Sequence, residues 1–294
     1  SLWVGVGLDE RGRYRAEMDL CEGRIDEAPE SPPVTPETQY DLASLTKPLA
    51  TALWFGVLTS RGLLDPHAPI GEVITCHDPM LNRTPLWRLV NHSAGLPAHF
   101  EYHRGLIGAC QMGAPATRCR DAVRRMIAST PTQTLPGERS VYSDLSYLLL
   151  EWICERVGGE DLLTFWGSIS SRLCSSPLYP EGITAPHFRP LSGAWRALGE
   201  DAPLAEQERA LYAATERCPW RGRVLRGEVH DDNAWMLGGV CGHAGLFGSA
   251  RAVGALAQVW MRAWHGLEQP TELTPEVARW MLDRGHLAPH GGSF

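Results

Sequence analysis

The sequence has no long apolar run and no concentrated positive charge, and both absences restrict what the protein can be. No stretch reaches the ~18 apolar residues that a membrane-spanning helix needs. The 27 basic and 34 acidic residues are spread along the 294-residue chain and give a net charge of −7. Without a Lys/Arg run or a basic stripe, we expect no nucleic-acid partner. The chain also opens without the pattern of a secretory signal peptide.

Paired cysteine motifs and the short motifs of several enzyme classes are absent as well. The eight cysteines are scattered, with no C-x-x-C pair and no zinc-ligand spacing. In a chain of this length we expect free, mostly buried thiols, which favours a reducing, cytoplasmic compartment. There is no G-x-S-x-G elbow and no Walker loop. We therefore expect neither a metal nor a cofactor.

What the sequence does contain is a substantial apolar fraction, 44%, and a pattern of strands followed by helices. Alternating apolar and charged residues over 14–20, after an apolar segment at 2–8 and a turn at 9–12, predict a β-hairpin. A hairpin alone would make a marginal sheet. We expect a helix over 44–61, closed by Gly62. The other expected helices are 84–92, 119–129, 143–157, 160–173, 204–215, 250–266 and 274–283.

The segment Ser44-Leu45-Thr46-Lys47 is the first candidate for chemistry. Residues three apart share one face of a helix, so the Ser44 hydroxyl and the Lys47 amine can meet. A serine hydroxyl is a weak nucleophile at neutral pH and needs an adjacent base, which a lysine can provide. Pro48 cannot donate a backbone hydrogen bond, so the helix should begin near Ser44, where backbone N–H groups favour a developing anion. Alone, the spacing is more typical of a helix N-cap followed by a surface lysine.

The wider context resembles class C β-lactamase-like serine hydrolases, which include D-Ala-D-Ala carboxypeptidases, class C β-lactamases and related esterases. The similarity covers 40–48 around the S-x-x-K and continues, in the family's order, through 89–97, 136–147, 238–240 and 245–250. The resemblance implies an α+β, β-lactamase/transpeptidase-like fold, an antiparallel sheet packed against a large helical region. The whole chain would be one such domain, with strands in 1–43 and helices in 44–294. It makes Ser44 the nucleophile and Lys47 its partner.

Tyr142-Ser143-Asp144 is similar to the family's Y-x-N element. There the tyrosine phenol moves a proton between nucleophile and leaving group, which implies this catalytic role for Tyr142 and a place beside Lys47 and substrate for Asp144. An Asp in place of Asn can hold the lysine by charge but cannot donate an amide hydrogen bond. This departure counts against strict β-lactamase activity more than against hydrolysis in general. Two alternatives stay open. Ser143-Asp144-Leu145 could instead be a class A-like S-D-N element. Tyr142 could also be a packing residue beside Asp144 as a helix N-cap.

His230 and Asp231 lie in a polar segment, 226–234, which forms a wall of the substrate pocket in the resembled family. We expect both to contact substrate, although an Asx-turn network would also explain them. A metal bound by this segment is less favoured, since neighbours on a strand point to opposite faces. His99 and His103, four apart, could share a metal on a helix, but surface histidines are the simpler interpretation.

His243-Ala244-Gly245 has the form of the family's third element, K/H-T/S-G, and His243 is a further candidate for substrate contact. We nevertheless expect this segment to precede a helix over 251–264, well before the strand that carries the third element. No Lys-Thr-Gly or His-Thr-Gly occurs in the chain. The third element and the C-terminal strands that complete the sheet are therefore expected beyond Phe294, in a chain truncated at its C-terminus.

Together these features predict a serine hydrolase that forms an acyl-enzyme on Ser44. Its substrate would be a D-Ala-D-Ala-type peptide, a β-lactam or a related amide or ester. A carboxylesterase of the same fold and a non-catalytic peptidoglycan- or ligand-binding module stay open. The partner would be a small molecule or a peptide; the oligomeric state is not given by the sequence. The resemblance also allows a periplasmic location.

Overall fold

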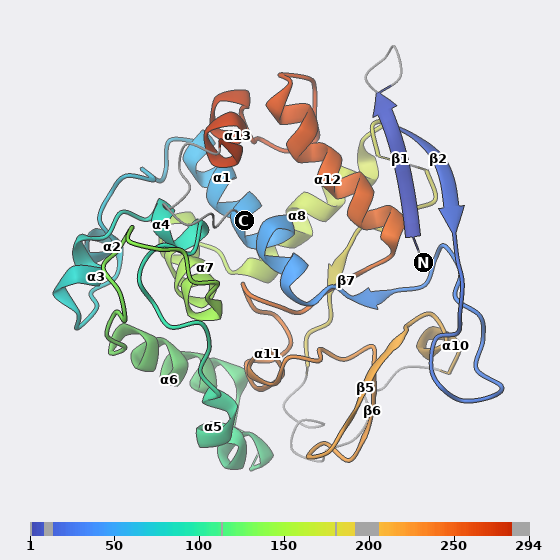
Figure 1. The fold of residues 1–294 in the computed structure, drawn as a ribbon, viewed down its shortest axis with the longest axis horizontal. Coiled ribbons are helices and arrows are strands. Elements are labelled where there is room, and N and C mark those ends of the chain that lie inside the picture. Colours follow the sequence, from blue (N-terminus) through green and yellow to red (C-terminus); the bar gives the residue numbers. More distant parts are fainter. Residues whose placement is uncertain (1, 9–13, 113, 180, 192–205, 284–294) are drawn as a thin grey trace.

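The computed structural model describes residues 2–8, 14–112, 114–179, 181–191 and 206–283. Figure 1 shows a mainly helical body with the strands toward the right of the view. The longer helices are α1 (Ala52–Ser60), α5 (Tyr102–Gln111), α6 (Ala116–Ala128), α7 (Asp144–Gly158), α8 (Leu162–Ser175), α12 (Ala250–Trp264) and α13 (Pro275–Leu282). The shorter ones are α2 (Ile70–Val73), α3 (Pro79–Arg83), α4 (Trp87–Val90), α10 (Glu206–Arg209) and α11 (Asp232–Met236). No helix in these ranges is both long and apolar enough to cross a bilayer.

The strands form three small antiparallel sheets. They are β1 (Leu2–Leu8), β2 (Tyr14–Leu20), β3 (Tyr40–Asp41), β4 (His187–Phe188), β5 (Ala214–Cys218), β6 (Arg223–Arg226) and β7 (Leu246–Gly248). The predicted hairpin of β1 and β2 is confirmed, with Leu2 opposite Leu20, and β1 lies against α12 (Figure 1). Its expected turn, 9–12, lies outside the described residues. A second sheet has the order β3-β7-β4, and β5 pairs with β6.

Most of the predicted helices are confirmed, since α6, α7, α8, α12 and α13 lie where the apolar periodicity placed them. The helix expected over 84–92 is reduced to α4, because Thr84 is extended (ψ 130°) before Pro85. The helix expected over 204–215 is wrong from residue 210 on. There the backbone pairs with the segment before β3, through hydrogen bonds from Gln39 N–H to Leu211 O and from Ala213 N–H to Gln39 O. Tertiary pairing overrides local propensity in this stretch.

The helix expected over 44–61 consists of three different pieces. A 3₁₀ turn (Ala43–Leu45) leads into a π turn (Lys47–Thr51) and then into α1. Pro48 lies in the first positions of the π turn, where the absence of its backbone N–H disturbs the helical hydrogen bonds least. Helix α1 is buried on nearly every side and Figure 1 places it among the other helices; its Trp54 stacks on Phe165 of α8 at 5.1 Å. The core thus fixes the segment that carries Ser44 and Lys47.

Helix α7 begins at Asp144 because Ser143 caps it. The Ser143 hydroxyl accepts a hydrogen bond from the Ser146 N–H (3.1 Å) and donates one to the Pro97 carbonyl (2.6 Å). Gly159, with φ 73°, ends the helix in the left-handed conformation that glycine adopts easily. This cap holds Asp144 in the first helical turn.

Glu151 lies about two turns after Asp144 in α7 and joins three parts of the fold. Its side chain is 2% exposed, pairs with Arg120 of α6, and accepts the Gly242 N–H at 2.7 Å. Arg120 also donates to the Val240 carbonyl at 2.6 Å, and Thr51 donates to the Gly242 carbonyl at 2.7 Å. The loop before β7 is therefore held on two helices and on the π turn.

We expect Glu151→Ala to lower the free energy of unfolding by about 3 kcal/mol, because it leaves the Arg120 charge without its buried partner. Urea unfolding measures the change. Glu276→Ala, at an exposed position in the first turn of α13, is the control and should change stability by less than about 0.5 kcal/mol. Equal unfolding midpoints for the two variants would contradict this role of Glu151.

Candidate active site

Ser44 and Lys47 lie in direct contact, as their spacing predicts. Ser44 is an exposed residue, and its hydroxyl accepts a hydrogen bond from the Lys47 Nζ at 2.9 Å. The Lys47 side chain is only 2% exposed, and its Nζ also donates to Asp144 Oδ1 (2.7 Å) and to the His243 carbonyl (3.0 Å). An ammonium group has three donors, so these three acceptors match it completely. The arrangement places a buried amine directly behind an accessible hydroxyl.

The turn before Ser44 is held by Asp41. Its carboxylate accepts the Ala43 N–H (2.8 Å) and the His230 N–H (2.7 Å). Burial raises the pKa of Asp41, although these two backbone hydrogen bonds act in the opposite direction. Ala43 has φ 45°, a left-handed conformation that is strained for alanine and persists only where the surroundings impose it. Asp41 thus fixes the strained backbone that presents Ser44.

The Asp144 carboxylate contacts two side chains, Lys47 and His99. Its Oδ1 binds Lys47, and its Oδ2 lies 2.8 Å from His99 Nδ1. Burial alone would raise the pKa of Asp144, but the charges of His243 and Lys47 together with the hydrogen bonds lower it below its usual value. The carboxylate is therefore ionised at neutral pH.

Tyr142 covers Lys47 from the solvent side. Its ring centroid lies 4.9 Å from Lys47 Nζ, and the residue is 52% exposed. His92 packs against Tyr142 at 4.5 Å and accepts the Ser143 N–H through Nδ1 at 3.0 Å. Burial and the Lys47 charge lower the pKa of His92 to about 4, so its imidazole is neutral at pH 7 and can act as this acceptor. The pocket here has a volume of about 340 Å³ and is lined by Leu42, Ser44, Leu45, Lys47, Pro48, His92, Tyr142 and Tyr147.

His243 and Asp231 lie behind Lys47 rather than in front of it. His243 is 1% exposed, and its Nε2 contacts Asp231 Oδ1 at 2.9 Å. Burial disfavours the charged imidazole, but the Asp231 charge outweighs it and raises the pKa of His243. The pKa of Asp231 is correspondingly lowered, by His243 and by the Ala234 N–H, against the effect of burial. The pair orients the backbone whose carbonyl binds Lys47.

The structure gathers Ser44, Lys47, Tyr142 and Asp144, whereas the side chains of the other expected substrate contacts have partners outside this group. His243 is too buried to touch a ligand in this conformation, and the His230 imidazole lies 3.4 Å from Glu216 of β5. The segment 243–245 runs into β7 and then α12, so the helix expected after it is confirmed.

His99 is exposed, as a surface histidine should be, and what sequence reasoning missed is its contact with Asp144. No sequence motif marks it; the contact arises because the Asp144 N–H donates to the Ala98 carbonyl at 2.8 Å. His103 instead lies 3.6 Å from Asp232 and stacks on Trp220, so the two histidines have different partners. Over the described residues there is no group of three or more His, Cys, Asp or Glu side chains arranged to bind a metal.

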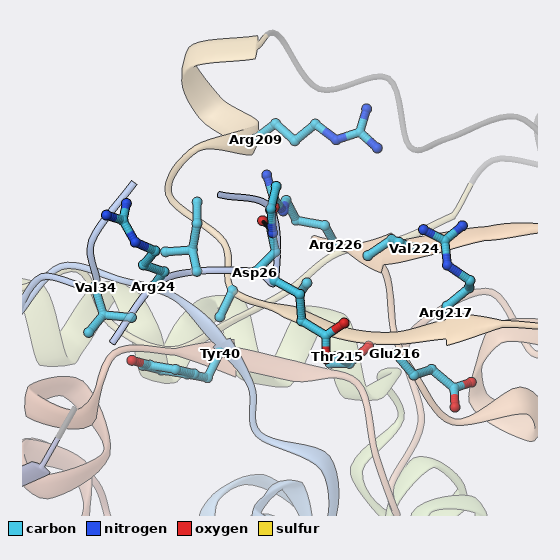
Figure 2. A pocket seen from close by; sticks show the side chains of 15 residues that line it. Arg24, Asp26, Val34, Tyr40, Arg209, Thr215, Glu216, Arg217, Val224 and Arg226 are labelled. Carbon is cyan, nitrogen blue, oxygen red and sulfur yellow. Dashed lines mark hydrogen bonds and ion pairs between the residues drawn. The ribbon is translucent and has the colours of Figure 1, made fainter. Parts of the chain in front are cut away.

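A larger hollow, of about 850 Å³, shares no lining residue with the Ser44 pocket. Figure 2 shows it between the segment 24–34 and the β5–β6 hairpin, with Arg24, Arg209, Arg217 and Arg226 among the side chains that line it. Asp26 pairs with Arg226 and neutralises part of this charge. The hollow contains no nucleophile beside a base, so the candidate site is the smaller pocket.

Comparison with known proteins shows the family of this chain. The family model described as Beta-lactamase matches residues 23–291. The chain belongs to the beta-lactamase family. A protein of Escherichia coli K12 named "Putative D-alanyl-D-alanine carboxypeptidase" is 31% identical over 237 residues, which cover 77% of this chain and 51% of that protein. A protein of the same name from Salmonella typhimurium LT2 is 29% identical and is covered to 52%. This beta-lactamase family member thus spans about half the length of these curated relatives.

Solved structures show the same β-lactamase/transpeptidase-like fold. SurE aligns with a TM-score of 0.59 and 22% identity, over 95% of this chain and 54% of that chain. A beta-lactamase/D-alanine carboxypeptidase from Pseudomonas syringae aligns with a TM-score of 0.59 and 16% identity, over 91% and 61%. The octameric penicillin-binding protein homologue from Pyrococcus abyssi aligns with a TM-score of 0.56 and 20% identity, over 85% of this chain and 50% of that chain. At these identities the likeness concerns the fold.

For this family member we expect the Asp231–His243 pair to make stability depend on pH. His243 has a raised folded-state pKa, so the stability it contributes is fully present below about pH 6.5, the usual value for an unfolded histidine, and is lost as pH rises through the raised pKa. Asp231→Asn should therefore cost about 2 kcal/mol at pH 6 and clearly less at pH 9. Urea unfolding at both pH values measures this, and a cost that does not change with pH would contradict it.

Proposed function

We propose that this protein is a serine hydrolase that forms an acyl-enzyme on Ser44. The observation that carries the proposal is the 2.9 Å contact between the accessible Ser44 hydroxyl and the buried Lys47 amine, at the edge of a pocket. Membership of the beta-lactamase family supports it. The match over residues 23–291 also supports a single β-lactamase-related domain.

In the proposed reaction, Lys47 in its neutral form takes the Ser44 hydroxyl proton while Oγ bonds to the substrate carbonyl carbon. The Ser44 backbone N–H would stabilise the oxyanion. Collapse of the intermediate breaks the bond to the leaving nitrogen or oxygen, which receives a proton through Tyr142 or Lys47. Water then attacks the acyl-enzyme, gives up its proton along the same route, and releases Ser44. Asp144 holds the amine in position by its 2.7 Å ion pair.

We infer a D-Ala-D-Ala-type peptide as the first substrate class to test, on the names of the curated relatives. One observation favours a second class, the short acyl esters. Both oxygens of Asp144 are engaged by Lys47 and His99, and a carboxylate offers no N–H to a substrate amide. An ester substrate places no amide beside Asp144 and therefore needs no N–H donor from this residue.

We expect a fluorophosphonate probe to label the full-length protein at Ser44, with no labelling of Ser44→Ala. Lys47→Met should slow labelling at least ~100-fold, because it removes the group that accepts the proton. Gel fluorescence and peptide mass spectrometry measure the site. Ser60→Ala, a serine at the end of α1 and away from the pocket, is the control. Labelling that survives Ser44→Ala would refute the acyl-enzyme.

Turnover of a D-Ala-D-Ala peptide, a β-lactam and p-nitrophenyl esters by the protein without probe separates the substrate classes. We expect the ratio of ester to peptide kcat/KM to fall on Asp144→Asn, because the amide restores a donor that a peptide can use. A binding module would instead retain muropeptide affinity, without turnover, in both the wild type and Lys47→Met. An unchanged ratio would remove the argument for esters.

A further inference from the structure

His99 has a contact that its position on the surface does not require. The residue is 43% exposed, yet its Nδ1 lies 2.8 Å from Asp144 Oδ2, the oxygen that Lys47 leaves unused. The chain Ser44 Oγ, Lys47 Nζ, Asp144, His99 is thus continuous, with distances of 2.9, 2.7 and 2.8 Å.

The backbone fixes His99 at this place independently of its side chain. The Ala98 carbonyl accepts the Asp144 N–H at 2.8 Å, and the Pro97 carbonyl accepts the Ser143 hydroxyl at 2.6 Å. The segment 97–99 is therefore attached to the start of α7 on both sides of the cap. These two hydrogen bonds place residue 99 next to Asp144 Oδ2.

Asp144 needs a second hydrogen bond to keep its orientation. Rotation of a carboxylate about χ2 has broad, poorly separated minima, so one contact to Lys47 leaves the plane of the group free. Lys47 and His243 both attract the carboxylate by charge, and attraction by charge alone does not set the plane of the group. A donor on Oδ2 fixes the carboxylate so that Oδ1 stays on Lys47.

We propose that His99 is a positioning residue, which acts through Asp144 to hold the Lys47 amine against the Ser44 hydroxyl. The inference rests on the proposed function of Ser44. His99 reaches neither Ser44 nor Lys47 by any contact that the described residues show. Its role is to supply an N–H to Asp144 at the position of Nδ1. A residue with only a packing role at position 99 would not need a hydrogen-bond donor.

Two substitutions at this position separate the donor from the side-chain volume. His99→Leu removes the N–H, whereas the amide nitrogen of His99→Asn can occupy the place of Nδ1 and retain it. Saturation kinetics of fluorophosphonate labelling give a maximal rate and a half-saturating concentration. We expect His99→Leu to lower the maximal rate about tenfold, the size of coupling expected for side chains in one hydrogen-bond network, with little change in half-saturation. His99→Asn should restore most of the rate.

The dependence on Asp144 is tested by a double-mutant cycle. In an Asp144→Asn background, His99→Leu should cause no further loss, since the contact it serves has already changed. His103→Asn is the matched control, because His103 faces Asp232 and Trp220 instead, and it should leave the labelling rate unchanged. Thermal unfolding of every variant shows whether a loss of rate is a loss of fold.

Three outcomes would overturn the role of His99. These are a wild-type rate in His99→Leu, an equal loss in His99→Asn, or an undiminished loss in the Asp144→Asn background. A wild-type protein that the probe does not label would instead remove the proposed function, and the role of His99 with it. The two failures are therefore distinguishable from one set of measurements.

Discussion

The site depends on one constraint, the burial of the Lys47 amine with acceptors for all of its protons. A buried ammonium without partners would cost several kcal/mol, and here a hydroxyl, a carboxylate and a carbonyl surround it. These acceptors come from the turn before α1, the start of α7 and the loop before β7. Each of the three segments must be positioned to within hydrogen-bond distance of one nitrogen.

Much of the surrounding structure serves that requirement. Ser143 caps α7 and places Asp144, while Glu151 and Arg120 hold the loop that contains His243. Asp231 fixes His243 from behind, and the resulting pair has opposite pKa shifts, as expected for charges that stabilise one another. The outer side of the network is thus structural, and the residues of the proposed reaction lie at its inner side.

Motifs anticipated the inner part of this network well. Ser44 with Lys47, and Tyr142 with Asp144, were expected from short segments, because each pair is close in sequence and local geometry already limits its arrangement. Elements shorter than a helical turn were not anticipated. The strands β4 and β7 have two and three residues, too few for an apolar period to show, and the helix expected over 204–215 overlaps the first two residues of β5. Helix α5 was missed because Gly105 and Gly108 weaken its propensity.

By itself the sequence determined the β1–β2 hairpin, most of the longer helices and the contact between Ser44 and Lys47. Those features follow from periodicity and from spacing within a few residues. Only the tertiary structure decided that His243 lies behind Lys47, that His230 turns to Glu216, and that His99 reaches Asp144. The reason is that the last contact joins residues 45 positions apart, and the contact between Lys47 and the His243 carbonyl joins residues 196 positions apart. Neither distance is encoded in any local pattern; each results from how the core packs the helices that carry these residues.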